Sequence, residues 1–179
     1  YDFALGGKGL DPSLPGGVSG TLLQAGQCFM VDMGGNFYGY MGDMSRVFSI
    51  GRLPEQAYTA HQTCIEIQEE IAAMAKPGTV CEDMYNKAIE IVTKAGFADY
   101  FMGVDQKAKF IGHGIGLEIN EMPVLAPRMK QELEPGMVFA LEPKIVLPGI
   151  GPVGIENSWA VTTDGLEKLT LCKEEIIEL

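Results

Sequence analysis

Runs of apolar residues separated by polar and glycine-rich positions divide the chain into predicted strands and helices. The first strands are expected at 28–33, ending in a turn at Gly34-Gly35, and at 37–40 and 46–50. A helix is expected from Pro54 to about Lys76, because proline is favoured in a first helical turn and Pro77-Gly78 ends the pattern. Residues 1–27 are rich in glycine and proline, which predicts a loop.

After residue 78 the sequence predicts a second helix, followed by a series of short strands. Thr79-Val80-Cys81-Glu82 has the form of a capping box and predicts a second helix that runs to Ala95, before Gly96. Further strands are expected at 137–141, 145–147, 155–162 and 169–172, with a hairpin turn at Thr163-Asp164-Gly165. Helices grouped between strands predict an α+β domain, a curved sheet with helices on one face. With no internal linker, 1–179 is expected to be a single domain.

Composition narrows the possible partners. Of the 179 residues 46% are hydrophobic, and Lys plus Arg number 13 against 24 Asp plus Glu, for a net charge of −11. Such a field repels phosphate backbones, so we expect no nucleic acid as partner. No apolar run approaches the length of a membrane span, so we expect no membrane partner either. The chain opens at Tyr1 without an initiator Met, and we expect it to be a fragment that lacks an N-terminal domain.

The number and spacing of the cysteines indicate the cellular compartment of the protein. The chain has four cysteines, widely scattered and without a CxxC pair: Cys28, Cys64, Cys81 and Cys172. This pattern is typical of reduced, buried thiols in an intracellular protein rather than of a disulfide framework. We therefore expect a cytoplasmic protein.

Five residues form the candidate site, although each alone has an ordinary structural explanation as a turn acid, a solvated acid or a loop histidine. They are Asp32, Asp43, His113, Glu142 and Glu156. Several of these acids end or follow strongly apolar runs, where an unpaired buried carboxylate costs several kcal/mol. Four carboxylates and one imidazole suit hard divalent ions, and the number of ligands favours two ions that share bridging carboxylates.

The order and spacing of these residues resemble a known family. The motifs are Asp32-x-Gly34, Gly39-Tyr40-x-x-Asp43-x-x-Arg46, Gly112-His113-Gly114-Ile115-Gly116-Leu117, Leu133-Glu134-Pro135-Gly136-Met137, Glu142-Pro143 and Ile155-Glu156. From about residue 20 to the C-terminus, the chain resembles the catalytic domain of pita-bread (creatinase/aminopeptidase fold) metallopeptidases, in particular the Xaa-Pro dipeptidases and aminopeptidases. The resemblance implies an α+β fold, a curved antiparallel sheet with helices on its outer face.

The same resemblance implies roles for the site residues. Asp32 would be a terminal ligand of one metal, Asp43 and Glu156 would bridge two metals, and His113 and Glu142 would complete the second. The ions would be manganese or cobalt, with zinc or iron as alternatives. Glu142 would also transfer a proton. Arg46 would orient a ligand carboxylate. The implied substrate is a short peptide, cleaved before proline, and the implied full-length protein is a homodimer.

Two positions depart from the family pattern. Asn120 stands where the related peptidases have a histidine, and it can donate a hydrogen bond to an oxyanion but cannot titrate. Lys144 follows Glu142-Pro143 where glycine is usual, which places a cation near the site. The only other histidine, His61, falls in the long predicted helix, where a packed or surface imidazole is expected.

Three functions stay open at this point. The leading hypothesis is a two-metal hydrolase that acts on Xaa-Pro peptide bonds, with Asn120, Arg46 and Glu142 assisting catalysis. Two family histidines are absent, one at position 120 and one in the loop at 10–16. Their absence motivates a second hypothesis, an enzyme of the same fold that acts on a small non-peptide substrate. A third is a non-catalytic binding module on a peptidase scaffold, although such modules usually lose metal ligands and here all five are present.

Overall fold

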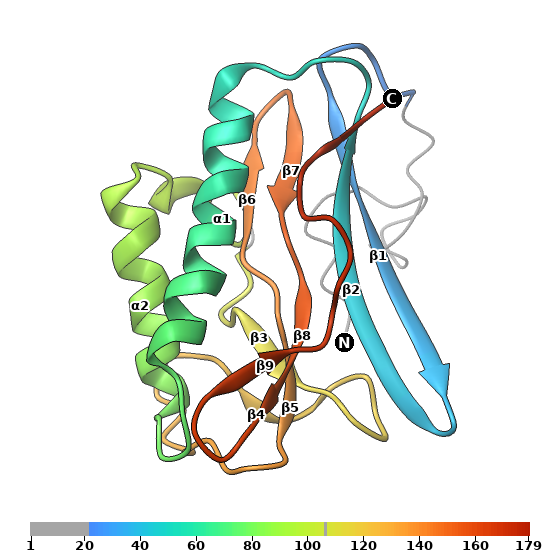
Figure 1. Cartoon of the computed structure of the whole chain (residues 1–179). Coiled ribbons are helices and arrows are strands. Elements are labelled where there is room, and N and C mark those ends of the chain that lie inside the picture. Colours follow the sequence, from blue (N-terminus) through green and yellow to red (C-terminus); the bar gives the residue numbers. More distant parts are fainter. Residues whose placement is uncertain (1–21, 106) are drawn as a thin grey trace.

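A long antiparallel hairpin forms one flank of the molecule (Figure 1). The computed structural model describes residues 22–105 and 107–179, so the first 21 residues of the predicted N-terminal loop lie outside the described residues. The hairpin consists of β1 (Cys28–Phe37) and β2 (Tyr40–Ser49), in register from Cys28–Ser49 at its base to Phe37–Tyr40 at its tip. Its inner half packs on the core, whereas its outer half is exposed.

The turn of this hairpin lies at Tyr38-Gly39, so the predicted turn at Gly34-Gly35 and the predicted strand at 37–40 are wrong. Tyr38 and Gly39 have φ of 50° and 90°, the left-handed conformation that two-residue hairpin turns require. The side chain of Asn36 accepts a hydrogen bond from the Gly39 N–H at 3.2 Å. Gly34 and Gly35 are ordinary strand residues opposite Asp43 and Gly42.

Both α-helices lie on the same side of the strands (Figure 1). They are α1 (Glu55–Met74), whose buried side chains include Ala57, Ala60, Cys64, Ile67 and Ile71, and α2 (Cys81–Lys94), which buries Met84, Ala88 and Ile91. Apolar side chains at three- and four-residue intervals form one stripe on each helix, and this stripe packs into the core. The two predicted helices are therefore confirmed to within a few residues.

The predicted capping box at the start of α2 is wrong. Val80 is the N-cap residue, and no side chain caps the helix. The N–H groups of Cys81 and Glu82 instead donate to the carbonyl oxygens of Gln131 and Met129, so a neighbouring segment satisfies them. The Glu82 carboxylate instead forms an ion pair with Lys130 and accepts a hydrogen bond from the Arg128 N–H.

The remaining elements are a 3₁₀ turn, η1 (Ala98–Tyr100), and eight short strands. The strands are β3 (Gly112–Gly114), β4 (Glu121–Val124), β5 (Val138–Leu141), β6 (Lys144–Leu147), β7 (Gly151–Gly154), β8 (Asn157–Val161), β9 (Leu166–Lys168) and β10 (Ile177–Glu178). They form sheets ordered β1-β2-β10, β4-β3-β5-β8-β9 and β6-β7. Among the described strands, only β10 pairs in parallel, with β2.

The C-terminal region departs from prediction in two places. The expected strand at 169–172 is absent, because after the Leu169 N–H bonds to Ser158 the chain leaves the sheet and Leu171 is 89% exposed. The hairpin strand is β9 instead. Cys172 is exposed, so the expectation of buried thiols holds for three cysteines and is wrong for this one; all four are unpaired.

Among the contacts that join the hairpin to the other strands, one positions the acidic residues. Ser45 of β2 forms an isolated antiparallel bridge with Glu156, the residue that lies between β7 and β8. The Glu156 N–H points to the Ser45 carbonyl oxygen at 3.4 Å. This bridge brings the acidic residues of the hairpin next to the residues that follow β5 and β7.

Candidate metal centre

The hairpin contributes two carboxylates on one face. Asp32 on β1 pairs with Ser45, and Asp43 on β2 pairs with Gly34, so all four residues share a face and the two aspartates are diagonal neighbours. Gly34 lies opposite Asp43 and leaves space above it. The Asp43 side chain is only 10% exposed, whereas Asp32 is exposed, contrary to the burial that its apolar flanks suggested.

His113 enters the site from β3, between two glycines. The backbone of β3 lies so close to β4 and β5 that a side chain would not fit at either glycine. A Cβ at Gly112 would come within 2.3 Å of the Ala140 carbonyl oxygen, and one at Gly114 within 2.3 Å of the Met122 carbonyl oxygen. The glycines thus let β3 pack between β4 and β5, which positions the imidazole.

Two glutamates complete the group from the ends of strands. Glu142 follows β5, and its N–H donates to the Ile111 carbonyl oxygen at 2.8 Å. Glu156 follows β7, and its Oε2 accepts a hydrogen bond from the Ser45 hydroxyl at 2.5 Å. Both side chains are buried.

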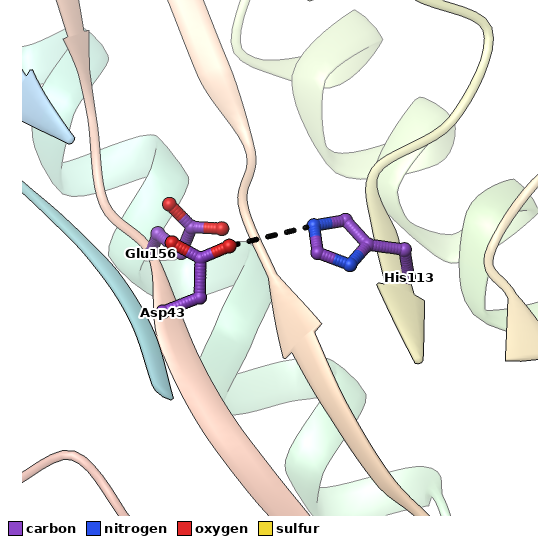
Figure 2. Close-up of side chains that lie close together, drawn as sticks. All are labelled: Asp43, His113 and Glu156. Atoms are coloured by element: carbon purple, nitrogen blue, oxygen red, sulfur yellow. Dashed lines mark ion pairs between the residues drawn. The ribbon is translucent and has the colours of Figure 1, made fainter. Parts of the chain in front are cut away.

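Asp43, His113 and Glu156 bring one potential ligand atom each within 4.8 Å of one another. In Figure 2 the two carboxylates lie side by side and the imidazole faces them, with His113 Nε2 at 3.8 Å from Asp43 Oδ2. Glu142 is adjacent, since its Oε1 lies 3.4 Å from the same nitrogen. Asp32 lines the same cavity of about 300 Å³, so all five predicted ligands surround one space.

The carboxylates repel one another in this cavity. Burial, followed by the charge of Asp32, raises the pKa of Asp43 to about 6. Burial and the charge of Glu142 raise the pKa of Glu156 to about 8. At Glu156, burial and the neighbouring carboxylates outweigh the opposing positive charge of Lys144.

Glu142 is the exception among the buried acids. Burial would raise its pKa, but the hydrogen bond to His113 and the charge of Lys144 outweigh burial and lower it. Lys144 Nζ lies 2.6 Å from Glu142 Oε2. For His113, burial lowers the pKa and the contact with Glu142 raises it, with a net rise.

This donor set fits divalent metal ions. The cavity lining holds four carboxylates and one imidazole against a single lysine, so its negative charge is not balanced by the described residues. Oxygen ligands with one nitrogen suit ions such as manganese, cobalt, iron or zinc. Asp43, His113 and Glu156 would hold a divalent ion, and Asp32 and Glu142 are further carboxylate ligands that line the same cavity.

Comparison with known proteins identifies the family. A model of metallopeptidase family M24 matches residues 4–163. The chain belongs to metallopeptidase family M24. Among curated M24 relatives, an Xaa-Pro dipeptidase of Pyrococcus furiosus is 31% identical over 166 residues, which cover 92% of this chain and 46% of that protein. The chain thus spans less than half the length of this relative.

Solved structures agree with this assignment. An Xaa-Pro dipeptidase from Bacillus anthracis superimposes with a TM-score of 0.81 at 34% identity, covering 93% of this chain and 46% of that one. An X-Pro aminopeptidase from Thermotoga maritima gives 0.79 at 29% identity, covering 87% and 43%. The expected pita-bread fold of the α+β class is therefore confirmed. No helix within the described residues is long and apolar enough to cross a membrane.

Arg46 acts differently from the expectation for this M24 domain. It was expected to orient a ligand carboxylate, but its guanidinium donates to the main-chain carbonyl oxygens of Ser45 and Glu156, both at 2.8 Å. It also donates to Asn157 Oδ1 at 2.9 Å. The side chain that holds the Glu156 carboxylate is Ser45, which the sequence analysis did not single out.

A second group of hydrogen-bonded polar residues supports the ligands, and we call Arg46, Gln68, Asn157 and Glu174 the rear network. The first three are buried and Glu174 is half-buried. Gln68 Nε2 donates to the carbonyl oxygens of Leu141 and Ile155, the residues just before Glu142 and Glu156, at 2.6 and 3.1 Å. Asn157 Nδ2 donates to Gln68 Oε1 and to Glu174 Oε1. One signal for Gln68 was available in the sequence: it is a polar residue on the apolar face of a helix.

Asn120 is one of the residues that line the cavity. It lines the cavity together with the apolar residues Ala108, Phe110 and Ile119. The Phe110 ring meets the His113 ring edge-on, with centroids 6.3 Å apart. The site therefore has a polar floor of carboxylates and a partly apolar wall, which the sequence analysis did not predict.

Proposed function

We propose that this chain is the catalytic domain of a two-metal hydrolase that cleaves the peptide bond before proline in short peptides. The observation that carries the proposal is the convergence of Asp43, His113 and Glu156 in a chain of family M24. Similar proteins are named Xaa-Pro dipeptidases, and this supports the choice of substrate. Because the chain covers less than half of those proteins, the whole enzyme's activity is part of the proposal.

In this mechanism Asp32, Asp43, His113, Glu142 and Glu156 hold the metals. Bound divalent ions supply Lewis-acid chemistry, which lowers the pKa of water and polarises a carbonyl group. Glu142 accepts the proton of the attacking water at its carboxylate and delivers it to the proline nitrogen, which must leave as a protonated secondary amine. His113 Nδ1 bonds the Gly114 carbonyl oxygen at 3.1 Å, so Nε2 is the nitrogen that would ligate the metal.

Asn120 and the apolar wall position the substrate. The Asn120 amide donates a hydrogen bond to the carbonyl oxygen on which negative charge develops. Phe110 and Ile119 supply an apolar surface for a proline ring, and a cavity of about 300 Å³ suits a short peptide rather than a folded chain. Arg46 contributes by holding the main chain at Glu156.

Metal identity, assembly and compartment complete the proposal. The oxygen-rich donor set favours manganese or cobalt, with zinc or iron as alternatives. We also propose that the full-length protein is a cytoplasmic homodimer with an additional N-terminal domain. The net charge of −11 supports small, uncharged or cationic substrates rather than nucleic acid.

Asn120 favours one alternative. The alternative is a same-fold enzyme that acts on a small non-peptide substrate. Asn120 lines the cavity and cannot titrate, which suits a reaction that needs no acid at this position. A non-catalytic binding module has less support, because all five ligand positions carry suitable side chains around one cavity.

The test is hydrolysis of a dipeptide panel by the purified protein supplied with manganese or cobalt. We expect Xaa-Pro dipeptides to be cleaved, Xaa-Ala dipeptides to be cleaved more slowly, and Asp43→Ala to abolish both reactions. We also expect chelation to lower the Tm, because the carboxylates lose their counter-ions. Metal binding without cleavage of any Xaa-Pro peptide would favour the non-peptide alternative.

A further inference from the structure

Lys144 is a buried cation that the proposed mechanism does not use. It begins β6, is 6% exposed and lines the same cavity as the candidate ligands. In the β6–β7 pair it lies opposite Gly154, where a Cβ would come within 3.2 Å of Lys144 Cγ. The glycine therefore leaves room for the aliphatic part of the lysine, whose ammonium group reaches the cavity.

The ammonium group is held at one point and keeps free donors. Nζ donates to Glu142 Oε2 at 2.6 Å, and within residues 22–105 and 107–179 this is its one hydrogen bond. An ammonium group has three N–H donors, and a buried donor without a partner costs free energy. Lys144 can therefore donate to an acidic group that enters the cavity and still keep its bond to Glu142.

The charge of the metal-loaded cavity also favours an anionic group. Four carboxylates line the cavity, and Lys144 is the one lysine or arginine among its described lining residues. Two divalent ions would balance the four carboxylates, which leaves the charge of the lysine without a counter-ion. A carboxylate on the substrate would supply it.

The position of Lys144 fits the carboxylate of a dipeptide. In the proposed mechanism Glu142 delivers a proton to the proline nitrogen, so this nitrogen lies about 3 Å from the Glu142 carboxylate. In an Xaa-Pro dipeptide the free α-carboxylate is attached to the carbon next to that nitrogen. A group bonded to Glu142 Oε2, as Lys144 Nζ is, therefore lies within reach of the substrate carboxylate.

We propose that Lys144 binds the free α-carboxylate of the substrate, so the enzyme prefers Xaa-Pro dipeptides to longer peptides. In a longer peptide, or in a dipeptide with a C-terminal amide, this position carries an uncharged carbonyl group. The ammonium group then lacks a counter-ion, and binding is weaker. The inference rests on the proposed function for the placement of the proline nitrogen.

The experiment compares Ala-Pro with its C-terminal amide as substrates of the manganese-loaded protein. We expect kcat/KM to be about 10²-fold higher for the dipeptide, mainly through KM, because a hydrogen bond between charged groups contributes an affinity of this order. Lys144→Met should remove most of this preference, and Lys144→Arg should keep most of it, since it keeps the charge. Lys87→Met is the matched control, because Lys87 forms an ion pair with Glu70 at 3.1 Å between the two helices.

A binding measurement makes the test independent of turnover. N-acetylproline and N-acetylprolinamide differ only in the carboxylate, and calorimetric titration into the manganese-loaded protein compares their affinities. We expect N-acetylproline to bind about tenfold more tightly or better. Lys144→Met should bind the two compounds with similar affinity, and Lys87→Met should match the unmodified chain.

The outcomes separate this inference from the proposed function. A preference for the dipeptide that is absent in the unmodified chain, or that Lys144→Met retains, would overturn the role of Lys144 and leave the peptidase proposal standing. An equal loss of kcat on both substrates in Lys144→Met would also overturn it, because the lysine would then act through Glu142. If no Xaa-Pro peptide is cleaved, the proposed function is wrong. Tighter binding of N-acetylproline that Lys144→Met loses would still support the inference, and equal binding of the two compounds would overturn it.

Discussion

The five candidate metal ligands, which we call the ligand side, and the rear network both consist of polar residues. They differ in how their charges and hydrogen-bonding groups are satisfied. On the ligand side, buried carboxylates face one another, and the pKa values of Asp43 and Glu156 are raised. In the rear network, Gln68 and Asn157 each use both their amide oxygen and nitrogen in hydrogen bonds. The protein satisfies its rear network with its own atoms and leaves the ligand side to be completed by cations.

This difference indicates that the ligand side binds metal and that the rear network stabilises the fold. A group whose charge is unbalanced by the protein gains free energy when an ion arrives, whereas a group that is fully hydrogen-bonded gains nothing from a ligand. Changes on the ligand side should therefore alter metal affinity and turnover, and changes in the rear network should alter the free energy of unfolding.

The largest effect is expected from the bridging carboxylates. Asp43→Ala and Glu156→Ala should each weaken manganese binding by about 10²-fold or more, and Asp32→Ala by less, because a bridging carboxylate holds two ions and Asp32 holds one. Titration calorimetry measures this, with the exposed Asp99→Ala as the control. Equal losses at all three positions would show that the bridging roles are assigned wrongly.

Asn120 should affect turnover without affecting metal. Asn120→Ala should lower kcat for Xaa-Pro hydrolysis by roughly 10²-fold, the usual cost of one oxyanion donor. Asn120→His, which restores the group found in related enzymes, should keep most of the activity and add a limb to the pH–rate profile. An unchanged kcat in Asn120→Ala would remove Asn120 from the mechanism.

Gln68 tests the other side of the comparison. Gln68→Leu removes the side-chain donor to two carbonyl oxygens and one of the two acceptors of Asn157 Nδ2. The free energy of unfolding should therefore fall by about 2–3 kcal/mol. Gln62→Leu, an exposed position on the same helix, should change it by less than about 0.5 kcal/mol. Denaturant unfolding of the metal-free proteins measures both values, and similar losses in the two variants would mean that Gln68 does not hold the strands.

The smallest expected effect concerns His61, which is buried against the Glu174 carbonyl oxygen at 2.6 Å. Burial lowers the pKa of His61, and the nearby Arg46 charge lowers it further against the opposing effect of Glu174 and Glu175. The unfolded chain therefore binds the proton more readily, so this contribution to stability is complete above a pH of about 6.5 and is lost as the pH falls. His61→Gln should flatten the decline of Tm below that pH, and an unchanged slope would contradict this.

Much of the site was predictable because metal ligands leave strong local marks. Glu142 and Glu156 stand beside apolar runs, and His113 stands between glycines, so their types and order indicated the chemistry. The helices were equally readable, since Pro54 and Pro77-Gly78 mark the ends of a periodic segment. These features depend on residues that are neighbours in the chain.

What could not be predicted depends on contacts between distant segments. Ser45 is an ordinary strand residue until β2 meets Glu156, 111 positions further along the chain. The hairpin turn was misplaced because two adjacent glycines predict a turn more strongly than Tyr38-Gly39 does. The strand β3 has only three residues, two of them glycine, and has no periodicity to detect.

The bridge between Ser45 and Glu156 has a consequence for folding kinetics. It joins residues that are 111 positions apart, so its formation carries a large loop-closure cost and is expected late in folding. Asp43 and Glu156 meet only when this bridge has closed, so we expect a cation to bind after the rate-limiting step of folding. Manganese should therefore slow unfolding and leave the refolding rate unchanged, because the metal stabilises the native state and not the transition state.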